Sequence, residues 1–417
     1  MIFKRQKYVD KLVSSQGNGL VKIVTGGRRC GKSFLLFNLF HNYLVSHDVS
    51  EDHIIELSLD DRKSKPLRNP DTLLDYIDEH VKKDGSTHYV ILDEVQMVED
   101  FVEVLLSLMH NSQLEIYVSG SNSKFLSKDV VTEFRGRGDE IRVWPLSFAE
   151  YYEEMGEDRS LSWREYYTYG GLPQVALLPD SEKKVEYLRS MYELTYLRDI
   201  IERNQLRNAD GMRQLVQILS SGIGSSQNPQ RISNTFQSVE GVSISRNTIK
   251  EYISYLQDAF LVEEALRYDV KGRKYIGTPL KYYFEDVGLR NARLGFRQVE
   301  ETHLMENIIY NELRVRGYQV DVGVVIKRTR TEGVQEKKQL EIDFVANMGS
   351  KRYYIQSAFH LPDDKKIAQE KASLINVKDS FKKIIIVKDV VKPLHDDDGI
   401  LTMSIYDFLL NEHSLEL

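Results

Sequence analysis

Residues 20–33, Leu-Val-Lys-Ile-Val-Thr-Gly-Gly-Arg-Arg-Cys-Gly-Lys-Ser, join an apolar run to a glycine-rich segment. The run predicts a buried strand, and the periodicity of residues 33–44 predicts a helix directly after it. Residues 26–33 fit the pattern G-x-x-x-x-G-K-[ST] in the strand–loop–helix context that this pattern requires. Gly26 and Gly31 let the backbone curl so that successive N–H groups face one anion, and the helix N-terminus adds positive charge. We therefore predict a phosphate-binding loop.

This loop predicts a nucleotide as ligand and Mg²⁺ as its companion ion. Lys32 can reach the β- and γ-phosphates, and the Ser33 hydroxyl can bind Mg²⁺. Cys30 is expected to be a tolerated small residue, because no histidine near it could activate its thiol. The predicted nucleotide-binding residues are Gly26, Gly27, Arg28, Arg29, Cys30, Gly31, Lys32, Ser33 and Phe34.

A second apolar run, residues 89–94, ends in the carboxylates Asp93 and Glu94. Asp93 at the strand end would hold Mg²⁺, directly or through water, and Glu94 would polarise the attacking water. A solvated Asp-Glu pair at the end of a strand is the alternative, and the upstream loop favours the catalytic interpretation.

Two further features follow. Residues 115–121 predict another strand, and the small polar residues at its end, Ser121 and Asn122 among them, could sense the γ-phosphate; a tight polar turn would explain them almost as well. Arg137 is the favoured arginine of the segment 134–137. It could stabilise transition-state charge on a neighbouring subunit's γ-phosphate, act within its own chain, or bind a surface carboxylate.

The composition is that of a globular protein. The chain has 417 residues, 41% of them hydrophobic and 29% charged, and one cysteine. The single cysteine excludes an internal disulfide and favours the reducing cytoplasm. No apolar run approaches 18 residues and the N-terminus lacks a signal-peptide core, so we expect no membrane partner. The net charge of −7 argues against a globally basic nucleic-acid coat protein, but residues 206–290 alone carry 11 basic against 9 acidic groups.

The chain resembles a prokaryotic family of AAA-type P-loop ATPases that carry a C-terminal domain of unknown function. The resemblance rests on GGRRCGKS, YVILDEVQMVEDF, FRGRGDEIRVWPLSFAEYY, YGGLPQV, KYYFEDVGL and LEIDFVAN, and it covers nearly the whole chain. It implies an α/β fold with an AAA-like parallel sheet core (1–150), a helical lid (151–205), a winged helix (206–290) and a C-terminal domain similar to the PD-(D/E)xK nuclease fold (291–417). It also implies ATP as the nucleotide, because no guanine-reading Asn-Lys-x-Asp sequence occurs.

Residues 242–260 independently predict a serine-capped helix with a buried apolar face. Polar side chains would project near its N-terminus, as in a recognition helix, and a basic strand–turn–strand wing would follow. Winged helices also serve protein contacts, so DNA binding stays one of two alternatives. The candidate DNA contacts are Ser245, Arg246, Asn247, Lys250, Lys271, Arg273 and Lys274.

In the C-terminal part, Glu306, Glu341, Asp343 and Gln356 fall where a metal-dependent nuclease would need them. Alanine occupies position 358, where that pattern has lysine, and Gln356 is a neutral amide. The sequence therefore predicts a degenerate nuclease fold, with Glu306, Asp343 and Gln356 as its remnant positions. Lys365, Lys366 or Lys371 could replace the missing lysine.

These observations predict a Mg²⁺-dependent ATPase that couples its nucleotide state to the winged-helix and nuclease-like domains on double-stranded DNA, as a homo-oligomer or with a protein partner. A slow nucleotide-dependent switch or assembly scaffold is the first alternative. An ATP-gated metal-dependent nuclease is the second.

Overall fold

The computed structural model describes residues 2–120, 134, 136–156, 158–240, 244–331, 334–389 and 391–417. The chain divides into two compact units. The first comprises residues 1–145, 172–177 and 258–260, and the second comprises residues 146–171, 178–257 and 261–417. Within the described residues, no helix is both long and apolar enough to cross a membrane.

The first unit is built on a parallel five-stranded sheet with the order β2-β3-β4-β1-β5. Its strands are β1 (Val21–Thr25), β2 (Ile54–Ser58), β3 (His88–Asp93), β4 (Leu114–Ser119) and β5 (Gly138–Arg142). Because all the pairings are parallel, the carboxyl ends of the strands meet at one edge of the sheet. This arrangement confirms the predicted α/β core.

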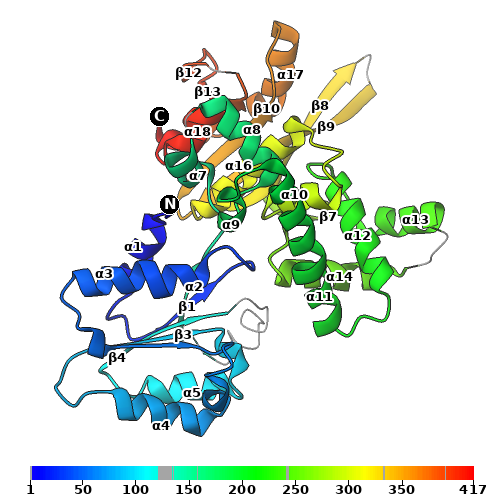
Figure 1. The fold of residues 1–417 in the computed structure, drawn as a ribbon. Coiled ribbons are helices and arrows are strands. Elements are labelled where there is room, and N and C mark those ends of the chain that lie inside the picture. Colours follow the sequence, from blue (N-terminus) through cyan, green and yellow to red (C-terminus); the bar gives the residue numbers. More distant parts are fainter. Residues whose placement is uncertain are drawn as a thin grey trace. The chain divides into compact units, whose positions relative to one another are not determined.

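Helices cover both faces of this sheet (Figure 1). One face carries α4 (Pro70–His80) and α5 (Phe101–Leu108). The other carries α1 (Gln6–Ser14) and the continuous helix formed by α2 (Lys32–Phe34), the π-helical turn Leu35–Phe40 and α3 (His41–Ser46). Short 3-10 turns at Glu51–His53, Lys65–Arg68 and Val95–Met97, and the short helix α9 (Pro173–Ala176), complete the unit.

The strand sequences explain this two-sided packing. Side chains alternate across a strand, so Ile23 and Leu92 face the α4–α5 layer while Val24 and Ile91 face the α1–α3 layer. All four are buried. Strands that are apolar on both faces are typical of a parallel sheet covered by helices.

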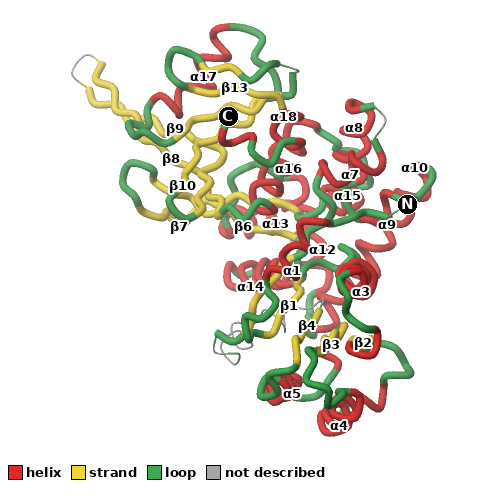
Figure 2. The backbone as a smooth tube through the Cα atoms, turned by 90° about the vertical axis from the view of Figure 1, so that its left-hand side faces the viewer, coloured by secondary structure: helices red, strands yellow, loops and turns green. Residues whose placement is uncertain are grey.

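The second unit is built on an eight-stranded mixed sheet with the order β12-β13-β11-β10-β9-β8-β6-β7. Figure 2 shows these strands in yellow. They are β6 (Val262–Asp269), β7 (Lys274–Phe284), β8 (Gln319–Thr331), β9 (Val334–Met348), β10 (Lys351–Ala358), β11 (Lys382–Val387), β12 (Leu394–His395) and β13 (Ile400–Ser404).

The helices of the second unit fall into three groups along the chain. The first is α7 (Phe148–Met155), α8 (Arg159–Tyr169), α10 (Ser181–Ser190), the π-helical turn Met191–Leu197 and α11 (Arg198–Arg203). The second is α12 (Ala209–Ser221), α13 (Pro229–Glu240) and α14 (Arg246–Asp258). The third is α15 (Val287–Arg293), α16 (Glu301–Val315), α17 (Asp364–Ile375), α18 (Ile405–Leu410) and the 3-10 turn Ser414–Glu416.

The hairpin β6–β7 joins the segment predicted as a winged helix to the segment predicted as nuclease-like. β6 pairs antiparallel with β7 and parallel with β8, with Arg267 opposite Val322. The strands on either side of residue 290 therefore belong to one sheet, and the second unit contains both segments.

Candidate nucleotide site

The predicted phosphate loop lies between β1 and α2, at the carboxyl edge of the five-stranded sheet. Gly26 (φ 139°) and Gly31 (φ 99°) adopt positive φ angles that side chains disfavour. A Cβ placed on Gly26 would also lie 2.1 Å from the main-chain oxygen of Val143. Position 26 therefore requires glycine for two reasons: its positive φ angle and the lack of space for a Cβ atom.

Lys32 places its ammonium group inside this loop. The side chain is 5% exposed, and Nζ donates hydrogen bonds of 2.9 Å to the carbonyl oxygens of Gly26 and Gly27. These two hydrogen bonds hold the ammonium group at the centre of the curved loop, where its positive charge could bind a phosphate group.

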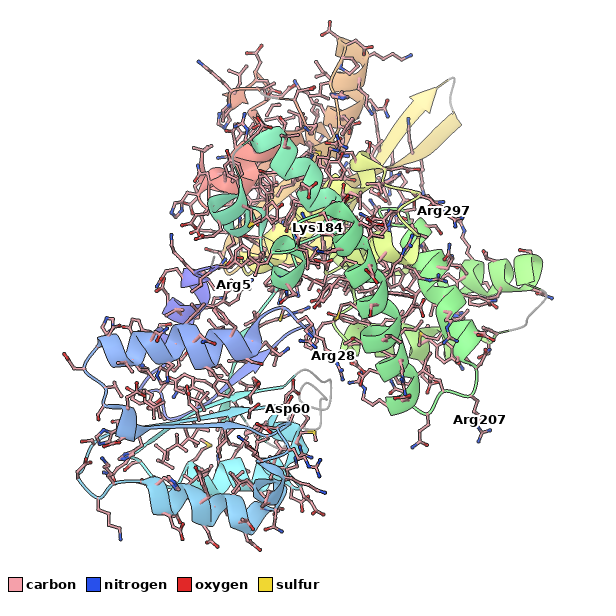
Figure 3. The ribbon with its side chains drawn as sticks, in the orientation of Figure 1. Arg5, Arg28, Asp60, Lys184, Arg207 and Arg297 are labelled. Atoms are coloured by element: carbon pink, nitrogen blue, oxygen red, sulfur yellow. The ribbon has the colours of Figure 1, made fainter. Side chains whose placement is uncertain are left out.

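The other loop residues differ in exposure. Cys30 is 1% exposed and belongs to the apolar cluster between the sheet and α1–α3, so it is a core residue. Arg29 and Phe34 are exposed, the latter to 40%. Figure 3 shows Arg28 of the loop and Asp60, which follows β2, on the same side of the first unit.

Asp93, at the end of β3, lies next to Ser33 and Ser119. The Ser119 hydroxyl, at the end of the neighbouring strand β4, donates a hydrogen bond to Asp93 Oδ1. Burial raises the pKa of the Asp93 carboxyl, and hydrogen bonds from Ser119 and Ser33 partly offset this rise. The structure thus brings the two predicted Mg²⁺ ligands, Ser33 and Asp93, together. It also places the Ser119 hydroxyl beside Asp93.

Glu94 follows Asp93 with a left-handed backbone (φ 52°), which turns its side chain away from the strand direction. Its Oε2 accepts a hydrogen bond from Gln96 Nε2. Gln96 was not among the predicted site residues, although it belongs to the segment YVILDEVQMVEDF. Its amide would orient the predicted catalytic carboxylate.

Arg137 lies at the other edge of the sheet. It immediately precedes β5, whose first residue Gly138 pairs with Val21, the first residue of β1. The phosphate loop follows Thr25 at the far end of β1, about 13 Å away at a rise of about 3.3 Å per residue. This position disfavours an action on the chain's own nucleotide, and it leaves two alternatives: action on a neighbouring subunit, which we propose, and binding of a surface carboxylate.

Arg142, which was not among the predicted site residues, ends β5 at the edge of the sheet where the loop lies. It pairs in register with Thr25, and its guanidinium carbon lies 4.0 Å from the ring centroid of Trp144 and 5.1 Å from that of Phe260. The predicted sensors Ser121 and Asn122 fall outside the described residues.

The segment YGGLPQV contributes to the site as well. A Cβ on Gly31 would lie 3.8 Å from Pro173 Cγ, so the start of α9 lies beside the second glycine of the loop. In the sequence this segment served as one of the motifs that carry the family resemblance.

The helix α14 begins as expected. The Ser245 hydroxyl accepts a hydrogen bond of 3.1 Å from the Thr248 N–H, which confirms the predicted serine cap. The predicted DNA contacts Ser245, Arg246, Asn247, Lys250, Lys271, Arg273 and Lys274 are all exposed. The helices α12, α13 and α14, followed by the hairpin β6–β7, have the element order expected of a winged helix.

A lysine from β7 changes the interpretation of the C-terminal carboxylates. Lys281, which is 3% exposed, places Nζ 2.9 Å from Glu306 Oε1, 2.9 Å from Glu341 Oε1 and 3.6 Å from Asp343 Oδ1. Burial lowers the pKa of the Lys281 amine, but the three carboxylates more than offset this and raise it overall. Lys281 is thus a buried cation that these carboxylates share.

The expected substitutes for the missing lysine lie elsewhere. Lys366 pairs with Glu370, and Lys371 pairs with Asp396. The Gln356 amide oxygen accepts a hydrogen bond of 3.4 Å from Ser373 on α17. Among the described residues, no group of three or more His, Cys, Asp or Glu side chains is arranged to hold a metal ion.

The fold and the loop identify the class of protein. The family model described as "AAA domain" matches residues 18–152, and one described as a domain of unknown function, DUF8612, matches residues 160–300. The N-terminal part is therefore a P-loop domain of the AAA type, as the resemblance implied.

Full-length relatives define the family. An uncharacterized protein of Haemophilus influenzae is 30% identical over 98% of this chain and 99% of its own length, and the chain belongs to the same family. An uncharacterized protein of Methanocaldococcus jannaschii is 25% identical over 95% of this chain and 86% of its own.

Two solved structures also align with the chain. The Aeropyrum pernix ORC1 protein in complex with DNA is 11% identical over 69% of this chain and 91% of its own, with a TM-score of 0.32. C. elegans PCH-2 is 15% identical over 44% and 55%, with a TM-score of 0.28. At TM-scores this low, neither structure bears on the function of this chain.

Proposed function

We propose that the protein is a Mg²⁺-dependent ATPase that couples its nucleotide state to the winged-helix and nuclease-like segments on DNA. The observation that carries the proposal is the convergence of Lys32, Ser33 and Asp93 at one edge of the sheet. A cation and a hydroxyl–carboxylate pair are what binding of a nucleotide–Mg²⁺ complex requires.

The residues at this edge fit Mg²⁺. The Asp93 carboxylate and the Ser33 hydroxyl are oxygen donors, which is the ligand class that Mg²⁺ prefers. Bound Mg²⁺ would neutralise charge on the β- and γ-phosphates. Glu94, held by Gln96, would orient the attacking water, while Lys32 would bind the phosphates.

The proposal that the protein acts on DNA rests on the second unit. The predicted contact residues on α14 and on the β6–β7 turn are exposed. They lie in residues 206–290, which is the only one of the four predicted segments with a positive net charge. Phosphate binding by exposed lysines and arginines needs both properties. A homo-oligomer would give Arg137 a neighbouring site on which to act.

Phosphate release tests the enzymatic part. Wild type should hydrolyse ATP only with Mg²⁺, and Glu94→Gln should lower the rate by about 100-fold or more while keeping ATP affinity. Lys32→Ala should lose binding as well. If wild type releases no more phosphate than Glu94→Gln yet both bind ATP, the protein is a nucleotide-dependent switch or scaffold.

An ATP-gated nuclease remains an alternative. Lys281, which lies among Glu306, Glu341 and Asp343, would supply the lysine that position 358 lacks. Incubation of plasmid DNA with Mg²⁺ or Mn²⁺, with and without ATP, tests it. Cleavage that Asp343→Ala abolishes would support a nuclease, and intact plasmid under every condition would remove this alternative.

A further inference from the structure

A positively charged groove lies in the second unit, between three turns that are far apart in the sequence. Its volume is about 700 Å³, the volume of roughly twenty water molecules at about 30 Å³ each. The three turns are the β6–β7 turn, the β9–β10 turn and the loop after α17. The charged side chains that line it are Lys271, Arg273, Lys351, Arg352, Lys378 and Asp379.

The β6–β7 turn is held in place by Asp269. Its Oδ1 accepts hydrogen bonds from the Lys271 N–H (3.1 Å) and the Gly272 N–H (2.9 Å). The Val270 N–H donates to the Val324 oxygen at 3.0 Å, and Lys271 Nζ donates to the Ile326 oxygen at 3.3 Å. The turn is therefore fixed on β8, and the Lys271 ammonium group is held with it.

Arg352 is fixed in the wall of the groove. Its Nε donates a hydrogen bond of 2.7 Å to Asn347 Oδ1, and its guanidinium lies 5.4 Å from the Tyr268 ring and 5.3 Å from the Phe381 ring. Both rings also line the groove, and Phe381 is 38% exposed. The groove thus combines cations with aromatic surface.

The carboxylate of Asp379 accepts hydrogen bonds from neutral donors. The Tyr354 hydroxyl donates to Oδ2 at 2.7 Å, and the Phe381 N–H donates to Oδ1 at 3.2 Å. Lys351 pairs with Glu416 outside the groove lining, in a half-exposed ion pair. Even with Lys351 discounted, four cations face one carboxylate, so the groove carries a net positive charge.

We propose that this groove binds the phosphodiester backbone of a nucleic acid, with Arg273 and Lys378 contacting phosphates and Phe381 offering a face to a sugar or base. Interleaved cations and aromatic rings are typical of nucleic-acid sites, whereas an acidic peptide would need the cations alone. The inference deepens the DNA part of the proposed function, on which it rests. It extends the binding surface from the β6–β7 turn to β9, β10 and the loop after α17.

Fluorescence anisotropy with the full chain tests the groove. The probes are a labelled 20-base-pair duplex, the matching single strand and a single-stranded RNA, with polyglutamate as the competitor. The double variant Arg273→Glu/Lys378→Glu should weaken binding at least about 10-fold and lower the salt dependence by about two phosphate contacts. The matched control Lys337→Glu/Lys392→Glu changes two exposed lysines outside the groove lining and should stay within about threefold.

The outcomes separate the groove from the rest of the proposed function. Equal weakening of nucleic-acid binding in both double variants would overturn the groove proposal. Competition by polyglutamate as strong as that by unlabelled duplex would overturn it as well. DNA binding by wild type that the groove variant keeps would also overturn it, but would leave DNA coupling standing. A wild type that hydrolyses ATP but binds no nucleic acid at low salt would remove both the groove and DNA coupling. The circular dichroism spectrum and the urea unfolding midpoint of the groove variant should equal those of wild type, which verifies its fold.

Discussion

The main-chain oxygen of Val143 occupies the space that a side chain on Gly26 would need. Val143 follows β5 and Gly26 follows β1, and the Val143 N–H donates a hydrogen bond of 2.8 Å to the Thr25 oxygen. A Cβ on Gly26 would approach that oxygen to 2.1 Å, well inside van der Waals contact. The end of β5 thereby constrains the start of the phosphate loop.

Replacing Gly26 by alanine should therefore destabilise the first unit and abolish nucleotide binding. The strained backbone and the collision together should cost more than about 2 kcal/mol in unfolding free energy. Gly277→Ala is the control, because its Cβ meets nothing within 4 Å and should change stability by less than about 0.5 kcal/mol. Urea unfolding and ATP titration measure both effects, and an ATP-binding Gly26→Ala protein would contradict the loop geometry.

Mixing variants tests whether Arg137 acts on a neighbouring subunit. Arg137→Ala and Glu94→Gln should each be inactive, but a mixed assembly can place an intact Arg137 beside a site with an intact Glu94. Random mixing should restore about one quarter of wild-type hydrolysis. A double variant carrying both changes should restore none with either partner. If Arg137→Ala alone hydrolyses ATP at the wild-type rate, Arg137 has no catalytic role.

Removing the Lys281 amine should destabilise the second unit strongly. Lys281→Met keeps the apolar stem but leaves three carboxylates with no shared cation, which should cost about 3–5 kcal/mol. Lys366→Met removes a helical ion pair with Glu370 and should cost only about 0.3–0.5 kcal/mol. Chemical unfolding compares the two variants, and equal losses would mean that the buried cluster adds no stability.

Asp321 should make stability depend on pH. Burial raises the pKa of its carboxyl, although the Tyr275 hydroxyl donates it a hydrogen bond of 3.2 Å. Just above the ordinary carboxyl range, the folded state still holds the proton that the unfolded chain has released, so the unfolding free energy falls as pH rises through that window. Asp321→Asn removes this fall while keeping an acceptor for Tyr275.

The melting temperature of Asp321→Asn relative to wild type should therefore increase from pH 4 to pH 7. A constant difference across this range would show that Asp321 titrates normally in the folded protein.

The nucleotide site was predictable from sequence because its residues follow parallel strands. The loop that leads to Lys32 follows the carboxyl end of β1, Asp93 ends β3, and in a parallel sheet these strand ends share an edge. The role of Gln96 was harder to predict from the sequence, because it depends on the left-handed backbone of Glu94.

Long-range features depend on sheet order, which the sequence pattern does not contain. Lys281 reaches Glu341 and Asp343 because β7 and β9 belong to the same sheet, although a boundary at residue 290 was predicted between them. Arg137 was likewise a candidate for the catalytic site, but the register of β5 places it at the opposite edge of the sheet from the loop.

The parallel pairing of β6 with β8 has a mechanical consequence. Main-chain hydrogen bonds connect the hairpin that carries Arg273, through β8, to β9, which carries Asp343, so these strands cannot hinge against each other without breaking some of these bonds. In any conformational change of the second unit, the hairpin and the carboxylate cluster should therefore move together. A truncation at residue 290 would accordingly not release a small folded module; it would leave β6 as an exposed sheet edge and favour aggregation.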